Sequence, residues 1–408
     1  MEELRRVVVV GGSLAGLRAC ETLRAEGFDG TITLVGDERH RPYDRPPLSK
    51  KLLAGDWEPD RIVLRAPERI DELGLELRLG VTADGLDVDG RVVSLADGSH
   101  VRADAVIVAT GARPRHLPGQ GNGVHVLRTL DDALSLREAL NPGARLVVIG
   151  AGFIGLEVAA TALGRGARVT VLEGLSAPLI RGLGAELGAA VARPLVEAGI
   201  DLRLDVRVAS VDATGVTLRD GRQIAADVVL VGIGVDPATD WLSGSDLIVR
   251  DGVVADETLR AAAGVYVAGD VARWRYAGTG EEWRIEHWTN AADQGAAAAR
   301  NLLAHAAGEP GTPFAPVPFV WSDQGRNRVQ VLGRPAEDGD ETVVAVGDPG
   351  GHAFVGLVRR GLQLRGVIGF NAPKPTMGYQ KLLASGASWD EAMALAADQT
   401  VPPPRPAP

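Results

Sequence analysis

The chain has 408 residues, 45% of them hydrophobic, and a formal net charge of −10 at pH 7. This length suits two or three domains with real cores. The negative charge argues against general nucleic-acid binding, and the sequence has no run of 18 apolar residues that would predict a transmembrane helix. A strand pattern begins at Arg5, which predicts no cleavable signal peptide. Because Cys20 is the single cysteine, no intrachain disulfide can form. We expect a cytoplasmic protein with no membrane contact and no metal site.

Two segments of the chain share one design, in which a buried strand, a glycine-rich turn, a helix and a second strand follow one another. Strands that alternate with helices indicate parallel sheets. We therefore predict two βαβ units of the kind that bind dinucleotides. The strand, helix and second strand are expected at 5–10, 17–25 and 31–35 in the first unit, and at 145–149, 156–164 and 168–172 in the second.

The second βαβ unit carries a complete GxGxxG pattern in Gly150, Gly152 and Gly155. Such a turn lets the backbone approach a pyrophosphate, and the following helix offers free N–H groups and the positive end of its dipole. Glu173 lies where an acid can bind a ribose 2′-hydroxyl. Because Glu173 would repel a 2′-phosphate and no arginine follows it directly, the sequence favours NADH over NADPH.

The first βαβ unit departs from this pattern. Gly11 and Gly16 fit, but Ser13 takes the middle place, where a small side chain still allows close approach. Either Asp37 or Glu38 could bind the ribose, and the sequence does not separate them. Two dinucleotide units in one chain indicate an electron relay, in which a mobile nicotinamide delivers two electrons to a bound flavin.

The remaining patterns suggest how the domains are divided. Three apolar runs that end in glycine, at 105–111, 228–234 and 265–270, are expected to be parallel strands whose carboxyl ends approach a ligand. After a proline-rich linker, alternating strands at 327–332, 342–346, 352–358 and 362–370 and a helix at 388–397 predict a small α+β domain. We expect an FAD-binding domain at 1–113 and 242–313, an inserted NADH-binding domain at 114–241, a C-terminal domain at 314–400, and a disordered tail at 401–408.

Several motifs of this chain resemble those of a known protein family. The chain resembles the FAD-dependent pyridine-nucleotide oxidoreductases, and among them the NADH-dependent ferredoxin reductases that serve oxygenases and cytochromes P450. The resemblance covers nearly the whole chain and implies a glutathione-reductase-like α/β fold with bound FAD and with NADH as cosubstrate. It is carried by the motifs at 43–50, 109–111, 150–157, 269–270, 287–291 and 321–324.

The resemblance also implies roles for single residues. Arg45 and Arg113 should contact the phosphates or the adenosine end of FAD, and Val81 should meet adenine through its backbone. Asp270 should accept hydrogen bonds from the ribityl or pyrophosphate region, and Trp288 should lie beside the flavin ring. The other residues expected at FAD are Leu14, Ala15, Ala109, Thr110, Gly111 and Gly269, and those expected at NADH are Phe153, Ile154, Gly232 and Gly234.

Lys50 and Glu157 are the expected catalytic residues. The resemblance places Lys50 beside flavin N5, and Glu157 closes the second glycine motif, so we predict an ion pair between them. Phe153 could cover the flavin or could simply fill a core. Disulfide reductases of this fold need cysteines beside the flavin, and residues 41–50 contain none. Electrons should therefore pass directly to an outside acceptor.

An acidic iron–sulfur ferredoxin is the expected acceptor. Residues 326–381 hold eight positive and five negative side chains within an acidic chain. We expect docking near Arg326, Arg328, Arg359, Arg360 and Trp321, on a monomer or weak dimer. Two alternatives remain open: an NADH oxidase or quinone reductase with a small-molecule acceptor, and an NADH-sensing scaffold of the same fold.

Overall fold

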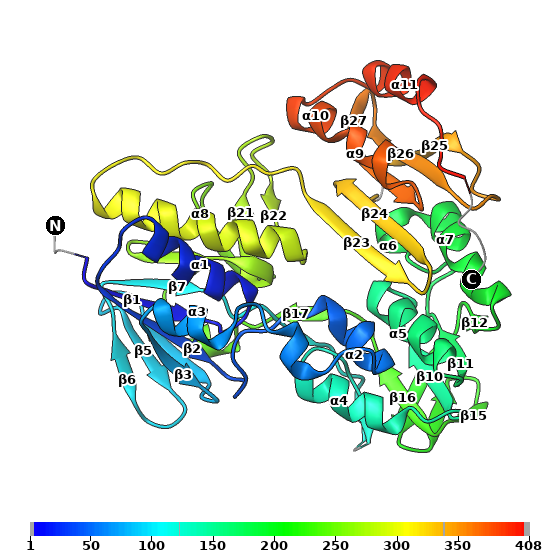
Figure 1. Ribbon diagram of the computed structural model, residues 1–408, viewed down its shortest axis with the longest axis horizontal. Coiled ribbons are helices and arrows are strands. Elements are labelled where there is room, and N and C mark those ends of the chain that lie inside the picture. The colour runs from blue at the N-terminus through cyan, green and yellow to red at the C-terminus, as the bar shows by residue number, and fades with distance from the viewer. Residues whose placement is uncertain (1–3, 122, 338, 404–408) are drawn as a thin grey trace. The chain divides into compact units, whose positions relative to one another are not determined.

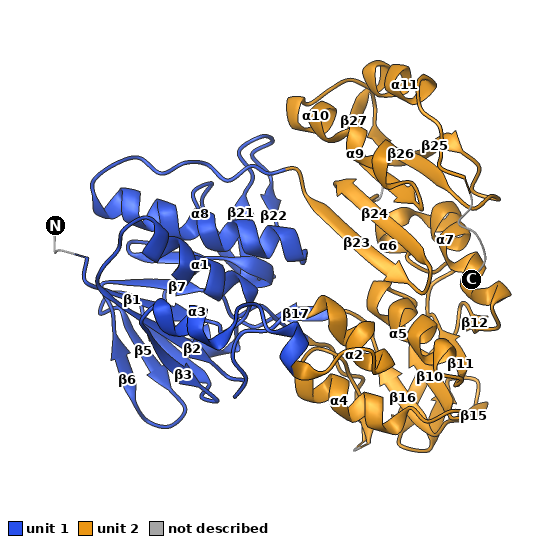
Figure 2. Cartoon of the chain, viewed as in Figure 1, with its two compact units in different colours: residues 1–44, 60–113, 235–316 blue, residues 45–59, 114–234, 317–408 orange. Residues whose placement is uncertain are grey.

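The structure, a computed structural model, divides into two compact units (Figure 2). It describes residues 4–121, 123–337 and 339–403. Unit 1 comprises residues 1–44, 60–113 and 235–316, and unit 2 comprises residues 45–59, 114–234 and 317–408. Segment 45–59 thus packs with unit 2 although both of its flanks belong to unit 1, which the sequence did not predict. The domain boundaries expected from the sequence stay a prediction.

Unit 1 is built on a six-stranded sheet in the order β19-β20-β7-β1-β2-β3 (Figure 1). Every neighbouring pair except β19–β20 is parallel. The four valines of β1 are all buried, as expected for a strand covered on both faces. The strands are β1 Arg6–Val10, β2 Thr31–Gly36, β3 Leu75–Leu79, β7 Ala105–Val108, β19 Arg260–Ala262 and β20 Val265–Val267.

Two helices, α1 (Leu14–Ala25) and α8 (Trp288–Ala306), pack against each other and against this sheet. Gly295 of α8 allows the close approach, because a Cβ atom there would lie 2.2 Å from the carbonyl oxygen of Ala15. The smaller elements of unit 1 are α3 Pro67–Glu72, β4 Ala83–Asp87, β5 Val92–Leu95, β6 His100–Arg102, β8 Ala112–Pro114, β17 Val235–Pro237, β18 Val253–Ala255, β21 Ala272–Arg275 and β22 Glu282–Trp283.

Unit 2 repeats this plan with a five-stranded parallel sheet in the order β12-β11-β10-β16-β9. The predicted α/β class with parallel sheets is therefore confirmed. The elements of this part are α2 Lys51–Ala54, β9 Val124–His125, α4 Leu130–Ala139, β10 Arg145–Ile149, α5 Phe153–Gly164, β11 Arg168–Leu172, α6 Ile180–Leu183, α7 Ala185–Glu197, β12 Asp201–Arg203, β13 Val208–Asp212, β14 Gly215–Leu218, β15 Gln223–Ala225 and β16 Val228–Val231.

The C-terminal part of unit 2 is an antiparallel sheet in the order β23-β24-β27-β26-β25. One face packs on the terminal helices through a core that includes Leu332, Leu357 and Val367. The other face meets α7, where a Cβ atom at Gly356 would touch Leu187. The elements are β23 Phe319–Gln324, β24 Asn327–Gly333, β25 Glu341–Gly347, β26 Phe354–Arg360, β27 Gln363–Phe370, α9 Pro373–Gly378, α10 Gln380–Ser385 and α11 Trp389–Ala397.

Three details differ from the sequence predictions. Helices α1 and α5 begin three residues earlier than expected, directly after Ser13 and Gly152, because the third glycine of each turn already lies in the first helical turn. Strand β23 and helices α9 and α10 were not predicted. Val401 packs on the C-terminal core and His352 hydrogen-bonds the Pro402 carbonyl, so residues 401 and 402 are packed rather than disordered. Residues 404–408 of the expected tail lie outside the described residues.

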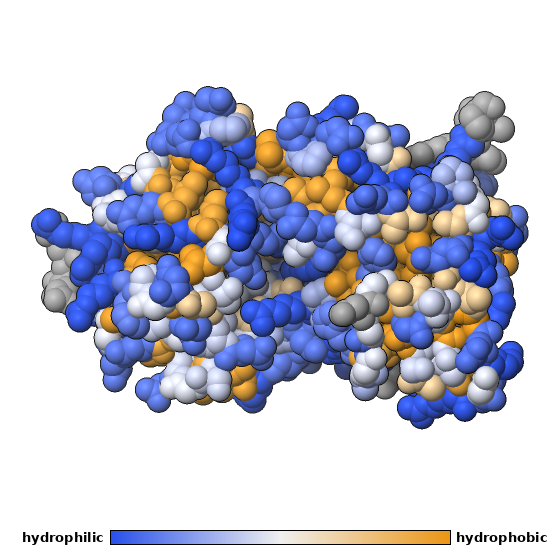
Figure 3. Space-filling view, turned by 90° about the horizontal axis from the view of Figure 1, so that it is seen from below, coloured by the Kyte–Doolittle hydropathy of each residue, from blue (hydrophilic) through white to orange (hydrophobic). Residues whose placement is uncertain are grey.

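The surface in Figure 3 is mainly hydrophilic, with apolar residues in small separate areas. In the described part of the chain, no helix has the length and apolar character that a membrane crossing requires.

Candidate active site

The glycine-rich turn of unit 1 is fixed by its own packing. Gly11 has a φ of +129°, and a Cβ atom there would lie 2.0 Å from the Ala109 carbonyl oxygen. A Cβ atom at Gly16 would lie equally close to the carbonyl oxygen of Gly11. The protein itself therefore requires glycine at both positions, whatever ligand the turn binds.

The turn of unit 2 has the same geometry. Gly150 has a φ of +103°, and its Cβ atom would lie 2.3 Å from the carbonyl oxygen of Gly232. A Cβ atom at Gly155 would lie 2.2 Å from the carbonyl oxygen of Gly150. At Gly152, by contrast, no described atom lies within 4 Å of a Cβ position. The middle place is therefore not constrained by protein packing, which explains how unit 1 accommodates Ser13 there.

Three of the longer helices begin without a side-chain cap. Within the described residues, α1, α5 and α8 have no capping side chain and no acidic residue in the first turn. Helices α4 and α11 instead begin with capping boxes, made by Thr129 with Asp132 and by Ser388 with Glu391. Because open N–H groups and the helix dipole favour anions, the starts of α1 and α5 fit the pyrophosphate of a dinucleotide.

The two units differ in the acid that follows their second strand. Val10 pairs with Val35 in unit 1 and Ile149 pairs with Leu172 in unit 2, so Gly36 occupies the place of Glu173. The Glu173 carboxylate accepts hydrogen bonds from the backbone N–H groups of Ala151 (2.7 Å) and Leu175 (2.9 Å).

In unit 1 both candidate acids lie further along the chain. Glu38 is half-buried and accepts a hydrogen bond from the Tyr43 hydroxyl, whereas Asp37 is exposed. The choice between them for the FAD ribose stays open.

Unit 1 gathers most of the residues expected at FAD along one sheet edge. The glycine turn follows β1, Ala109–Gly111 follows β7, and Gly269 with Asp270 follows β20, and these three strands are neighbours. Thr110 donates a hydrogen bond to the Ala238 carbonyl oxygen at 2.8 Å. Carboxyl ends of adjacent parallel strands are where open α/β sheets bind ligands.

Polar groups without a partner lie at the start of α8. Among the described residues, His287 Nδ1, Asn290 Oδ1 and Gln294 Nε2 are buried and make no hydrogen bond. Gln294 uses its other amide atom to accept a bond from the Gly269 N–H at 2.8 Å. Burial lowers the pKa of His287 to about 4, although the nearby Asp270 acts in the opposite direction. These groups fit a region that receives a polar ligand, and the sequence had assigned His287 no role.

Other residues of the predicted FAD set are already engaged. Trp288 Nε1 donates to Asp44 at 2.6 Å. The Val81 N–H donates to the Gly36 carbonyl oxygen, so an adenine contact would use the Val81 carbonyl. Arg113 pairs with Asp240 at 3.3 Å on the surface of unit 1. Arg45 belongs to unit 2, where it donates to the carbonyl oxygen of Arg128.

The predicted ion pair between Lys50 and Glu157 is confirmed. Lys50 Nζ lies 2.6 Å from Glu157 Oε2, and both residues belong to unit 2. The Glu157 side chain is 6% exposed and that of Lys50 is 19% exposed, so the charges are largely removed from water. Lys50 also donates to the carbonyl oxygen of Pro46 at 3.0 Å.

Helix α5 and its C-cap residue hold segment 45–59 through side chains spaced four residues apart. Glu157 binds Lys50 and the Ser49 hydroxyl. One turn later Thr161 donates to the Ser49 carbonyl oxygen at 2.8 Å, and after another turn Arg165 donates to the Leu53 carbonyl oxygen. One face of α5 therefore fixes the segment that carries Lys50.

The residues expected at NADH surround the start of α5. Gly232 and Gly234 follow β16, the strand next to β10. Ile154 is exposed at the start of the helix, and the ring of the half-buried Phe153 lies beside Gly182. Whether Phe153 covers a flavin stays a prediction.

Cys20 is suited to a core position and not to redox chemistry. It is a free, fully buried residue of α1, and burial raises its pKa to about 12. Its thiol is therefore protonated at neutral pH, whereas redox cysteines react as thiolates.

The basic residues expected to dock a ferredoxin are largely paired with acids. Arg328 lies 2.6 Å from Asp323, and Arg360 lies 2.7 Å from Asp340. Arg359 donates to Glu341 at 2.8 Å, and Trp321 stacks on Phe319. These three arginines are therefore not isolated cations, although the positive excess of residues 326–381 already counts Asp340 and Glu341.

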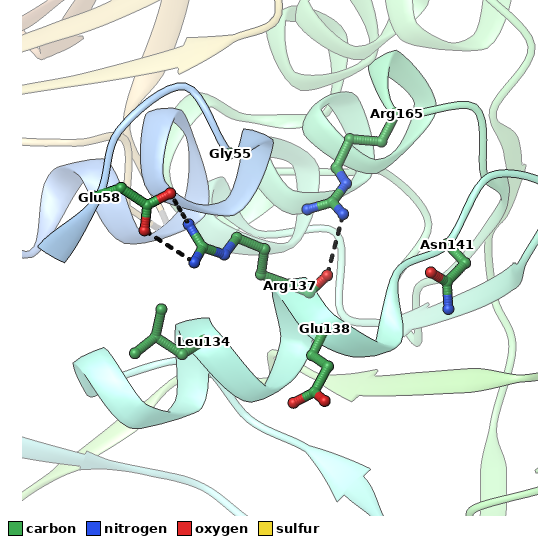
Figure 4. A pocket seen from close by; sticks show the side chains of 7 residues that line it. All are labelled: Gly55, Glu58, Leu134, Arg137, Glu138, Asn141 and Arg165. Carbon is green, nitrogen blue, oxygen red and sulfur yellow. Dashed lines mark hydrogen bonds and ion pairs between the residues drawn. The ribbon is translucent and has the colours of Figure 1, made fainter.

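A cavity of about 580 Å³ lies beside α4, and no glycine of the two turns lines it (Figure 4). Arg137 binds Glu58 there at 3.2 Å, and Arg165 donates to the Arg137 carbonyl oxygen. The lining carries two carboxylates, those of Glu58 and Glu138, so the cavity differs from the uncapped helix starts described above. The lining residues are Gly55, Glu58, Leu134, Arg137, Glu138, Asn141 and Arg165.

Comparisons with known proteins agree with this geometry. Residues 5–295 match the family model described as pyridine nucleotide-disulphide oxidoreductase, and residues 319–402 match the model described as reductase C-terminal. The chain is 38% identical over 388 residues to rhodocoxin reductase of Rhodococcus erythropolis, covering 93% of this chain and 89% of that protein. It is 37% identical over 336 residues to the ferredoxin–NAD(+) reductase subunit of a benzene 1,2-dioxygenase system of Pseudomonas putida, covering 80% of each.

A solved structure is similar over nearly the whole chain. The reductase in the crystal structure of the covalent putidaredoxin reductase–putidaredoxin complex superposes with a TM-score of 0.89 at 31% identity. The match covers 97% of this chain and 99% of that one.

Proposed function

The chain belongs to the pyridine nucleotide-disulphide oxidoreductase family, and on that premise we propose that it is an NADH-dependent ferredoxin reductase that carries FAD. The observation that carries the proposal is the presence of two dinucleotide-type turns, each with its first and third glycines fixed by packing, in a chain whose one cysteine is buried and inert. The relatives reported above are named as a rhodocoxin reductase, a reductase subunit of a benzene 1,2-dioxygenase system and a putidaredoxin reductase. We expect an oxygenase or cytochrome P450 system to be served here too.

Unit 1 supplies the residues for FAD, which when bound accepts a hydride and releases electrons one at a time. The N–H groups at the start of α1 would hold the pyrophosphate, with Gly11 and Gly16 keeping the turn close. The open start of α8 would favour negative charge on the flavin ring. The unpartnered His287 and Gln294 groups would face the polar part of the cofactor.

Unit 2 supplies the residues for NADH. The start of α5 would bind the pyrophosphate, and Glu173, already oriented by two backbone N–H groups, would accept hydrogen bonds from the ribose. Lys50, held by Glu157, would stabilise negative charge where the hydride arrives. We expect Lys50 and Glu157 to act together as an ion pair.

The test is anaerobic reduction of the purified flavoprotein by NADH in a stopped-flow instrument, followed by mixing with [2Fe–2S] ferredoxin, [3Fe–4S] ferredoxin or rubredoxin. We expect fast flavin reduction and fast transfer to one of these proteins, with slow oxidation by oxygen. Fast oxidation by oxygen or a quinone without any iron–sulfur protein would favour the oxidase or quinone reductase alternative. Slow turnover with every acceptor would favour the sensing scaffold.

The docking surface is tested by charge reversal. Arg326→Glu with Arg328→Glu should slow ferredoxin reduction and weaken its salt dependence, while ferricyanide reduction by NADH stays unchanged. Arg222→Glu is a matched control, because Arg222 forms a similar exposed pair with Asp220 outside the C-terminal sheet. Equal losses with both acceptors would place the damage at the flavin and remove these arginines from the docking surface.

A further inference from the structure

The Glu157 carboxylate receives donors from two parts of unit 2 that are far apart in sequence. Ser49 and Lys50 both donate to Oε2, at 2.5 Å and 2.6 Å. Ser322 donates to the other oxygen, Oε1, at 2.7 Å. Glu157 and Ser322 are 5% and 1% exposed, so water cannot readily replace any of these donors.

Ser322 belongs to the C-terminal sheet, within the motif Trp321–Gln324. Along β23 successive side chains point to opposite faces, so Ser322 and Gln324 share the face toward α5. Trp321 and Asp323 share the other face, where Trp321 stacks on Phe319 and Asp323 pairs with Arg328. The motif thus divides into an outer pair at the expected docking surface and an inner pair at Glu157.

Gln324 lies behind Ser322. Its side-chain amide donates to the Ser322 hydroxyl oxygen at 3.5 Å, and Gln324 is 1% exposed. A hydroxyl that accepts from Gln324 keeps its own proton for Glu157. The three residues form one buried chain of hydrogen bonds, Gln324 to Ser322 to Glu157, that ends on the carboxylate holding Lys50.

We infer that Ser322, supported by Gln324, is a positioning residue that fixes the Glu157 carboxylate and through it the ammonium group of Lys50. Ser49 and Lys50 both bind the same carboxylate oxygen, Oε2. Among the described hydrogen bonds, only that from Ser322 holds the other oxygen, Oε1. Without it the carboxylate can rotate and carry Lys50 with it. The C-terminal domain would then serve the hydride site as well as the partner surface. This inference rests on the proposed function.

The first test measures Lys50 directly and needs no turnover. The sequence has only four lysines, Lys50, Lys51, Lys374 and Lys381, so acylation by an amine-reactive ester can be followed for each by mass spectrometry. In the Ser322→Ala holoprotein we expect Lys50 to be acylated several-fold faster, while the exposed Lys51 is unchanged. Thr376→Val is the matched control, because it removes another fully buried hydroxyl of the C-terminal part, one that binds the Ala372 carbonyl.

The second test asks whether Ser322 acts through Glu157. Ser322→Ala should lower the limiting rate of flavin reduction by NADH about tenfold, the lower end of what a hydrogen bond to a charged group contributes. In a Glu157→Gln background the same change should alter that rate by less than about twofold. Ser322→Cys keeps the side-chain volume with a weaker donor, and it replaces Ser322→Ala if that variant does not fold.

Several outcomes would overturn the inference. One is that Ser322→Ala and Thr376→Val lower the thermal midpoint alike while Lys50 acylation and flavin reduction stay at the unmutated level. Another is a full effect of Ser322→Ala in the Glu157→Gln background. Failure of the unmutated protein to be reduced by NADH would instead count against the proposed function, and the acylation result would still stand.

Discussion

The two βαβ units share their backbone and differ in their ligand chemistry. In both, the first and third glycines are required because a carbonyl oxygen fills the space of a Cβ atom. The middle place meets no such demand in unit 2, and there the units diverge, with Ser13 against Gly152. They also diverge at the acid, with Gly36 against Glu173, although a Cβ atom at Gly36 would lie only 3.2 Å from the Gly12 Cα atom. The first and third glycines are therefore held in common by the fold, whereas the middle place is free to follow the ligand. The predictions below test that division.

The largest effect is expected at the first glycine of each turn. Gly11→Ala and Gly150→Ala should each lower the free energy of unfolding by about 3–5 kcal/mol, because a left-handed backbone and a clash with a carbonyl oxygen act together. Denaturant unfolding measures this. Gly27→Ala is the control, since its site is left-handed but open, and should cost about 1 kcal/mol. Similar losses at all three sites would contradict the packing argument.

The next largest effect on stability is expected at the buried ion pair between Lys50 and Glu157 in unit 2. Lys50→Met leaves the Glu157 carboxylate buried without its cation, which should cost about 3 kcal/mol of stability and slow flavin reduction by NADH. Lys51→Met is the neighbouring control, because Lys51 and Asp56 form an exposed pair, and removing it should have almost no effect. If the two variants behave alike, Lys50 is an ordinary surface lysine.

A pH effect is expected from α8, which only unit 1 has. Burial lowers the pKa of His287 to about 4, against about 6.5 in the unfolded chain. Unfolded protein therefore binds more protons between these values, so stability is full above pH 6.5 and falls as the pH drops toward 4. The loss between pH 7 and pH 5 should be about 1–2 kcal/mol. In His287→Gln this part of the pH dependence should vanish, and a profile that the substitution leaves unchanged would assign it to other groups.

The preference for NADH over NADPH should depend on Glu173, whose equivalent in unit 1 is Gly36. Glu173→Gln removes the charge but keeps an oxygen that can accept from Ala151. The preference of kcat/KM for NADH over NADPH should fall about tenfold, the lower range for a charge-assisted hydrogen bond. Steady-state assays with both coenzymes decide this. Equal efficiency with NADPH in the unmutated protein would refute the role of Glu173.

The smallest effect on stability is expected at the middle glycine. Gly152→Ser copies unit 1 into unit 2, and it should change the free energy of unfolding by less than about 0.5 kcal/mol, because the added atoms meet open space. NADH affinity should change instead, since the ligand approaches there. A large loss of stability with normal NADH binding would show that packing, and not the ligand, requires glycine at position 152.

The sequence predicts those parts of this molecule that local patterns determine. The valine run of β1, the glycine spacings and the strand–helix alternation led to both βαβ units and to the α/β class. The Lys50–Glu157 pair was also predicted, although only the family resemblance linked two residues 107 positions apart.

What the sequence did not predict depends on long-range packing. Nothing local marks Ser322 as a partner of Glu157, because the hydrogen bond joins residues 165 positions apart. The ion pairs within the expected docking surface were not predicted for a similar reason, since net charge does not show that Arg328 and Arg360 bind acids. The sequence also did not show which residue of unit 1 is equivalent to Glu173 of unit 2. Only the strand pairing shows that it is Gly36.

The placement of segment 45–59 has a consequence for how the protein is made. The segment belongs to unit 2, yet it leaves the ribosome long before α5 and its C-cap, which hold it through Glu157, Thr161 and Arg165. Until α5 emerges, the segment has no helix to pack against. Leu52 and Leu53, which are fully buried in the finished protein, are then exposed. The first part of the chain therefore cannot complete its fold until residues 153–165 have also been synthesised.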